Sequence, residues 1–137
     1  MDEHQKRILI VDDEPDIRLI LRSILESYGY QCDEANNGVE ALERIKASDY
    51  SVVLLDYSMP LMNGLKVLEK VGQASWIVRP HMIMITANSD ELLRKQALNA
   101  GAAAVLAKPF DLEQVLFAIA RTIQNGQPSL PCFHQPP

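Results

Sequence analysis

The sequence has few cysteines, no excess of basic residues and no long apolar run. Its two cysteines, Cys32 and Cys132, are too few for a disulfide framework, and this usage predicts a reducing, cytoplasmic compartment. The formal net charge of −5 argues against direct binding of DNA or RNA, because neutralising phosphates requires clustered Lys and Arg. No apolar run approaches the roughly 18–20 residues of a membrane span. We therefore expect no direct contact with nucleic acid or with a membrane.

The composition and the chain ends indicate one domain followed by a tail. The 137 residues, of which 47% are hydrophobic and 23% charged, have the composition of an ordinary soluble globular domain. The polar N-terminal stretch 1–7 precedes an apolar segment of only four residues, so it does not resemble a signal peptide. Four of the last ten residues are proline, which argues against packed structure there. We expect one folded domain over residues 1–125 and a flexible, Pro-rich tail over 126–137.

Short apolar runs alternate with helical patterns along the chain. Runs bounded by turn residues predict five strands, over 8–11, 30–35, 52–55, 82–85 and 104–107. Apolar residues at helical spacing predict five helices, over about 15–29, 39–47, 64–71, 89–99 and 112–123. Because such alternation forms βαβ units, the sequence predicts a doubly wound (βα)5 fold of the α/β class, with a parallel sheet covered on both faces. The pattern does not predict a position for Trp76, the one tryptophan, which lies in the connector 72–80.

Polar residues stand where the predicted strands end. Asp12 and Asp13 follow the first strand, and Asp56 follows the third. Thr86 follows the fourth strand, and Lys108 follows the fifth. Asp56 alone could cap a loop, and an isolated Thr or Lys at a strand end is usually a surface residue. In an open parallel sheet, however, ligands bind beyond the carboxyl ends of the strands, so these residues together predict a site at that edge.

The residue types at this edge limit its chemistry. Three neighbouring carboxylates repel one another and require a compensating cation. Carboxylate oxygens with room for water suit Mg²⁺, and a carboxylate can itself act as a nucleophile that forms an aspartyl phosphate. The Lys108 ammonium and the Thr86 hydroxyl would stabilise the charge on a phosphoryl group in transfer. These residues indicate phosphoryl transfer to an aspartate, with Mg²⁺ as the cofactor.

Two other classes of phosphate-handling protein fit the sequence less well. A Mg²⁺-dependent phosphatase with an aspartate nucleophile would have a second acid two residues after Asp56, where Ser58 stands. A nucleotide-binding domain would have a glycine-rich turn after the first strand. Residues 12–15 are Asp-Asp-Glu-Pro, so this turn contains three acids and no glycine.

The motifs at these strand ends resemble the signature set of response-regulator receiver domains (CheY-like) of two-component signalling. They are Asp12-Asp13, residues 56–64 (DYSMPLMNG), Thr86-Ala87 and Lys108-Pro109-Phe110. The resemblance extends over residues 6–124, and the joint set is far more specific than any single motif. It implies a flavodoxin-like sheet with five parallel strands in the order 2-1-3-4-5.

The resemblance also implies a role for each residue of the acidic cluster. Asp56 matches the phosphoacceptor, which takes a phosphoryl group from a phosphohistidine on a sensor histidine kinase or a histidine phosphotransfer protein. Asp13 and Asp56 match the carboxylates that bind Mg²⁺ directly, and Asp12 matches the acid that acts through water. The backbone carbonyl of Ser58 matches the remaining protein ligand.

Lys108 and Thr86 match the residues that respond to the phosphoryl group. Lys108 matches the lysine that pairs with the phosphate, and the Lys108–Pro109 bond is expected to be cis. Thr86 matches the hydroxyl that moves towards the phosphate on activation. Many family members carry an aromatic residue three positions before the lysine, where this chain has Val105. Val105 is either ordinary strand packing, the interpretation that we favour, or the sign of a muted or different switch.

The function implied by the resemblance is that of a signalling switch and not of an enzyme. Phosphorylation of Asp56 would change the binding of a downstream effector protein, or the action of an output domain that this sequence does not contain. The opposing possibility is a receiver that binds partners without ever being phosphorylated. The complete set of acids, together with Thr86 and Lys108, argues against that possibility.

Overall fold

A five-stranded parallel sheet forms the centre of the fold in the computed structural model, which describes residues 6–76, 79–88 and 90–125. The strands are β1 (Arg7–Val11), β2 (Gln31–Ala35), β3 (Val52–Asp56), β4 (His81–Thr86) and β5 (Ala102–Ala107). They lie in the order β2-β1-β3-β4-β5, and every neighbouring pair is parallel. This order confirms the predicted doubly wound (βα)5, flavodoxin-like α/β fold.

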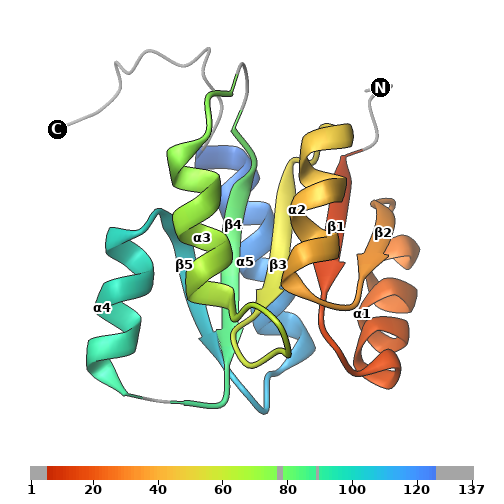
Figure 1. Ribbon diagram of the computed structural model, residues 1–137. Coiled ribbons are helices and arrows are strands. Elements are labelled where there is room, and N and C mark those ends of the chain that lie inside the picture. The colour runs from red at the N-terminus through yellow and green to blue at the C-terminus, as the bar shows by residue number, and fades with distance from the viewer. Residues whose placement is uncertain (1–5, 77–78, 89, 126–137) are drawn as a thin grey trace, which may run out of the picture.

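Helices cover both faces of the sheet (Figure 1). The helices are α1 (Pro15–Ser27), α2 (Gly38–Ala47), α3 (Gly64–Gln73), α4 (Glu91–Asn99) and α5 (Leu112–Asn125). Buried side chains of α1 and α5 pack with one face of the sheet, and those of α2, α3 and α4 pack with the other. Within the described residues, no helix has both the length and the apolar character needed to cross a membrane.

The central strands β1 and β3 are buried on both faces. Ile8 and Ile10 belong to the core on the α1–α5 face, while Leu9 and Val11 belong to the core on the α2–α3–α4 face. All five residues of β3 are buried. A strand without a solvent face can be apolar at every position, whereas a half-exposed strand alternates. The continuous apolar runs over 8–11 and 52–55 therefore become strands in the interior of the sheet.

The first helix begins and ends where the sequence predicts. α1 starts at Pro15, which is tolerated in the first turn because the N–H that it lacks would have no partner within the helix. The helix ends at Ser27, and Gly29 follows with a φ of +94°, a left-handed conformation that favours glycine.

The fourth helix begins slightly later than predicted. α4 starts at Glu91, and the Asp90 side chain caps it by accepting a hydrogen bond from the Leu92 N–H. Serine and aspartate are both good N-caps, so the pattern alone does not choose between adjacent candidates. Ser89, the predicted start of this helix, lies outside the described residues, as does the predicted tail over 126–137.

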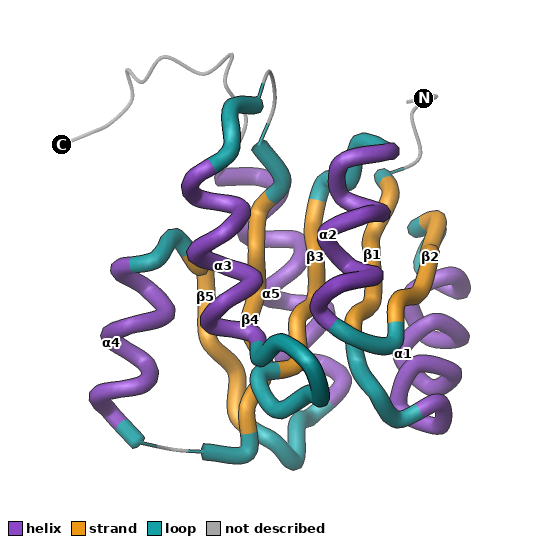
Figure 2. The backbone as a smooth tube through the Cα atoms, viewed as in Figure 1, coloured by secondary structure: helices purple, strands orange, loops and turns teal. Residues whose placement is uncertain are grey.

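The loops that follow the strands gather at one edge of the sheet (Figure 2). The loop after β3 closes on itself, because the Gly64 N–H donates to the Tyr57 carbonyl over 2.8 Å. The Asn63 side chain then caps α3 by accepting a hydrogen bond from the Lys66 N–H over 2.9 Å. A Cβ atom on Gly64 would lie 2.8 Å from the backbone oxygen of Asp56. The loop therefore packs directly against the end of β3.

We predict that Gly64→Ala destabilises the protein and that Gly72→Ala, in the same helix, does not. At Gly64 a Cβ meets backbone atoms that cannot move independently, so we expect the free energy of unfolding to fall by about 2 kcal/mol. At Gly72 the nearest atom is the end of the flexible Arg79 side chain, 3.1 Å away, and the better helix propensity of alanine is worth about 0.5–1 kcal/mol. Urea unfolding measures both values. Equal stability of the two variants would contradict the close packing of the loop on β3.

Candidate functional site

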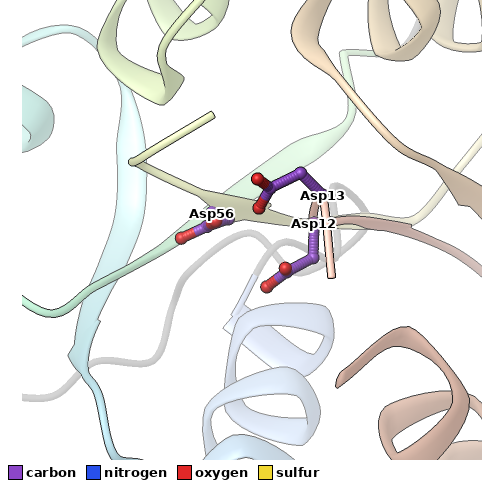
Figure 3. A group of neighbouring side chains, drawn as sticks. All are labelled: Asp12, Asp13 and Asp56. Atoms are coloured by element: carbon purple, nitrogen blue, oxygen red, sulfur yellow. The ribbon is translucent and has the colours of Figure 1, made fainter. Parts of the chain in front are cut away.

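Three carboxylates meet at the carboxyl edge of the sheet (Figure 3). Asp12 and Asp13 directly follow β1, and Asp56 is the last residue of the neighbouring strand β3. One oxygen of each carboxylate lies within 4.8 Å of the others. Asp12 and Asp56 are only 3% and 4% exposed, whereas Asp13 is exposed to solvent. The structure thus brings together the three acids that the strand pattern predicts at one edge.

Lys108 reaches these acids from two strands away. It follows β5, which is separated from β3 by β4, and its backbone N–H donates to the Thr86 carbonyl over 2.8 Å. Its Nζ atom lies 3.2 Å from Asp12 Oδ2 and 3.2 Å from Asp56 Oδ1. The Lys108–Pro109 bond is cis, as predicted. One ammonium therefore joins the two buried carboxylates.

Burial controls the protonation of Asp56. It disfavours the charged carboxylate, and repulsion from Asp12 adds to this effect. Together they raise the pKa of Asp56 to about 6, although attraction by Lys108 and a hydrogen bond from the Ser58 backbone act in the opposite direction. Burial also disfavours the Lys108 ammonium, but the attraction of the two acids outweighs it, and the pKa of Lys108 is raised. Lys108 is therefore charged at neutral pH, whereas Asp56 titrates at a pH slightly below neutral.

The charge of the site fits a divalent cation. The cluster has three carboxylates, and one ammonium contacts two of them, so ionisation of all the acids leaves an excess of negative charge. The donors are hard carboxylate oxygens, and the exposed side chain of Asp13 leaves the cluster open to water. Mg²⁺ prefers oxygen ligands of this kind and usually keeps several waters. The acidic cluster, Asp12, Asp13 and Asp56, could therefore hold a metal ion.

Thr86 lies at the same edge of the sheet, with its hydroxyl already hydrogen-bonded. It is buried at the end of β4, and its Oγ1 accepts a hydrogen bond from the Asn88 N–H over 2.9 Å. Thr86, Arg94 and Val105 are among the residues that line a small cleft of about 160 Å³. Val105 is half-buried and packs against the core on the α2–α3–α4 face. The position that is aromatic in many receivers is thus held here by a small side chain beside an open cleft.

Several contacts that hold the acids in place are not predicted by the sequence pattern. The Ser58 backbone N–H donates to the Asp56 carboxylate, and the Glu14 N–H donates to Asp12 Oδ1 over 2.9 Å. The Arg18 guanidinium donates to the backbone carbonyl of Asp12 over 2.7 Å. One signal for Arg18 is present in the sequence, because a helix that begins directly after the acids brings its first turns close to them.

Comparisons with known proteins agree on one family. The family model described as "Response regulator receiver domain" matches residues 8–120. The chain is 37% identical over 115 residues to the chemotaxis protein CheY of Halobacterium salinarum, a match that covers 84% of this chain and 94% of that protein. It is 36% identical over 127 residues to the transcriptional regulatory protein ResD of Bacillus subtilis, covering 92% of this chain and 52% of ResD. The chain thus spans about half the length of this transcriptional regulator.

Similar solved structures belong to the same family. A CheY-like response regulator receiver domain protein from Methanospirillum hungatei superposes with a TM-score of 0.80 at 31% identity, covering 89% of this chain and 96% of that one. The chemotaxis response regulator CheY4 of Vibrio cholerae superposes with a TM-score of 0.81 at 28% identity, covering 87% and 99%. The resemblance inferred from the strand-end motifs is therefore confirmed. Most of this chain, from residue 8 to residue 120, belongs to the response regulator receiver domains, which are signalling switches of two-component systems and not enzymes in the usual sense.

Proposed function

We propose that Asp56 is the phosphoacceptor and that it takes a phosphoryl group from a phosphohistidine of a sensor histidine kinase or a histidine phosphotransfer protein. The observation that carries this proposal is the contact between its buried carboxylate and Lys108, at 3.2 Å, beside two further acids. Asp13 is exposed, so water competes with a phosphodonor for its oxygens.

In the transfer step, a carboxylate oxygen of Asp56 attacks the phosphorus atom of the phosphohistidine. A P–O bond forms and the P–N bond breaks, and its electron pair stays with the imidazole nitrogen, which takes up a proton. The product is an acyl phosphate on Asp56. Lys108 pairs with the phosphoryl oxygens, and the neighbouring acids keep its ammonium charged for that role.

We assign the Mg²⁺ of this reaction to the acidic cluster. Asp13 and Asp56 would hold the ion directly, Asp12 would act through water, and the Ser58 backbone carbonyl would complete the protein ligands. Asp12 suits the outer role because both of its oxygens already accept hydrogen bonds from the protein. When bound, Mg²⁺ neutralises the charge that the carboxylates and the phosphoryl oxygens bring together.

The phosphoryl group would switch the protein through Thr86 and Lys108. It brings strong acceptor oxygens to the end of β3, and the Thr86 hydroxyl, which accepts from the Asn88 N–H, would move to donate to them. The cleft beside Thr86 gives this movement room. Val105 serves as ordinary strand packing in this scheme, because it lies against the core.

The surface beside Lys108 is suited to a protein as phosphodonor. A cleft of about 560 Å³ opens there, and most of its lining is apolar: Ile17, Ile20, Pro109, Phe110 and Leu112. The downstream partner would be an effector protein or an output domain, since the chain matches only half of a transcriptional regulator. We place this switch in the cytoplasm, with the receiver domain over residues 1–125 and a Pro-rich tail over 126–137.

We predict that incubation with acetyl phosphate and Mg²⁺ adds one phosphoryl group to the protein and that Asp56→Asn abolishes the addition. The amide that replaces the carboxylate is not a nucleophile, so no acyl phosphate can form. Intact-protein mass spectrometry measures the addition. Asp49→Asn is the matched control, because Asp49 is an exposed acid just before the amino end of the same strand. An unmodified wild-type protein would support the receiver that only binds partners, and a modified Asp56→Asn variant would place the phosphoacceptor elsewhere.

We also predict that Asp13→Asn weakens Mg²⁺ binding at least roughly 10-fold, because even indirect support of a metal ligand is commonly worth that much. Isothermal titration calorimetry of the unphosphorylated protein measures the dissociation constant without any turnover. Asp16→Asn is the control, since Asp16 is an exposed acid in the first turn of α1. Chelation of Mg²⁺ should also stop phosphorylation of the wild-type protein. Equal Mg²⁺ affinity of the two variants would remove Asp13 from the site.

The raised pKa of Asp56 predicts a pH-dependent stability. Its pKa is about 6 in the folded protein against an ordinary 3.8, so the folded state holds the proton more tightly than the unfolded state does. Above about pH 6 the folded protein carries an unfavourable charge, and Asp56→Asn should then raise the free energy of unfolding by at most about 3 kcal/mol. This gain should shrink as the pH falls through 6 and vanish below about 4, where both states are protonated. Urea unfolding in EDTA across this range tests it; a gain that does not depend on pH would contradict the assigned titration.

A further inference from the structure

The backbone of Asp12 is held from both sides by contacts to β2 and α1. β2 itself contributes no residue to the acidic cluster. The Asp12 N–H donates to the Ala35 carbonyl at the end of β2 over 3.2 Å. The Asp12 carbonyl accepts a hydrogen bond from Arg18 Nη1 over 2.7 Å. Both polar groups of the Asp12 backbone are therefore used just beyond the end of β1.

Arg18 is itself fixed by a residue of β2. Its Nε donates to Glu34 Oε1 over 2.8 Å, while Nη1 of the same guanidinium reaches Asp12. The Arg18 side chain is 16% exposed, so little of it is free to move in solvent. The second Glu34 oxygen accepts from Arg22 Nη1 over 2.9 Å, which holds the carboxylate in turn. α1 and β2 lie side by side at one end of the sheet (Figure 1). The hydrogen bonds from Arg18 and Arg22 to Glu34 join these two elements.

The carbonyl that Arg18 holds belongs to the peptide unit between Asp12 and Asp13. A peptide unit is planar, so a hydrogen bond that orients the Asp12 carbonyl also orients the N–Cα bond of Asp13. Asp13 lies beyond the last residue of β1 and is exposed, so the strand ladder does not direct its side chain. The guanidinium is thus in a position to set the relative direction of two neighbouring acids.

We propose that Arg18 is a positioning residue, which aligns the Asp12–Asp13 peptide so that the acidic cluster binds Mg²⁺. This inference rests on the proposed function of the cluster. The positioning role needs the planar guanidinium of arginine, because this group donates in two directions at once, to Glu34 and to the Asp12 carbonyl. A lysine ammonium is a point donor and would hold one of these partners well at the expense of the other.

Arg22 offers a matched control on the same helix. It carries the same charge and donates to the same Glu34 carboxylate, but its other hydrogen bond goes to Glu26. Loss of Arg22 therefore removes one positive charge and one bond to Glu34, and it leaves the bond from Arg18 to Asp12 in place. Any difference between the two arginine variants isolates the contact with the Asp12 carbonyl.

The test is the Mg²⁺ dissociation constant of the full chain, measured by isothermal titration calorimetry at a pH well above 6, where Asp56 is charged. We expect Arg18→Gln to bind Mg²⁺ roughly 10-fold more weakly than the wild-type protein, and Arg22→Gln to stay within about twofold, as expected for an exposed ion pair. Arg18→Lys should fall between them, because its ammonium can still reach the Asp12 carbonyl. Circular dichroism confirms folding of each variant, and urea unfolding in EDTA separates metal affinity from stability.

Two results would overturn the inference while leaving the proposed function intact. One is wild-type Mg²⁺ affinity in Arg18→Gln, and the other is an equal loss in Arg22→Gln, which would make the effect one of net charge. If Arg18→Gln does not fold, the Mg²⁺ affinity of Arg18→Lys tests the inference instead. An affinity equal to that of the wild-type protein would then overturn it. A wild-type protein that binds no Mg²⁺ would overturn the proposed metal site itself, and this inference with it.

Discussion

Repulsion among closely spaced carboxylates is the constraint on which the rest of this structure depends. Asp12, Asp13 and Asp56 bring oxygens within 4.8 Å of one another, and burial and repulsion together raise the pKa of Asp56 to about 6. Lys108 compensates part of the charge by contacting both buried acids at 3.2 Å. The excess of negative charge that remains is the reason that the cluster could bind a metal ion. The surrounding fold must hold these groups together against their own repulsion.

The fold meets that requirement by anchoring the acids to its most buried strands. β1 and β3 have no solvent face, and each leads directly into acids at the carboxyl edge. The loop after β3 packs so closely that Gly64 has no room for a Cβ beside the Asp56 backbone. The peptide after Asp12 is held by Arg18, which a carboxylate of β2 fixes in turn. A strand that contributes no acid to the cluster therefore still helps to decide where the acids lie.

Sequence periodicity predicts the elements well because it reflects local packing. Continuous apolar runs identify the buried strands, and apolar residues at helical spacing identify the helices that cover them. The start of α4 is less certain, since more than one residue ahead of it makes a good cap. The pattern does not predict the position of Trp76, because its indole N–H donates to the Val71 carbonyl, a contact set by the turn after α3. The strand order follows from the resemblance to a family and not from periodicity.

The sequence by itself determined which chemistry this protein can carry: acids, a hydroxyl and an amine at the ends of successive strands, where a parallel sheet brings its carboxyl ends to one edge. Only the tertiary structure decided how these groups interact. It put Lys108 between Asp12 and Asp56, hydrogen-bonded Thr86 to the Asn88 N–H and tied the Asp12 carbonyl to Arg18. The physical reason is that residue spacing reports only neighbours along the chain. Distances between side chains of different strands, and the burial that shifts their pKa values, arise only when the strands lie beside one another.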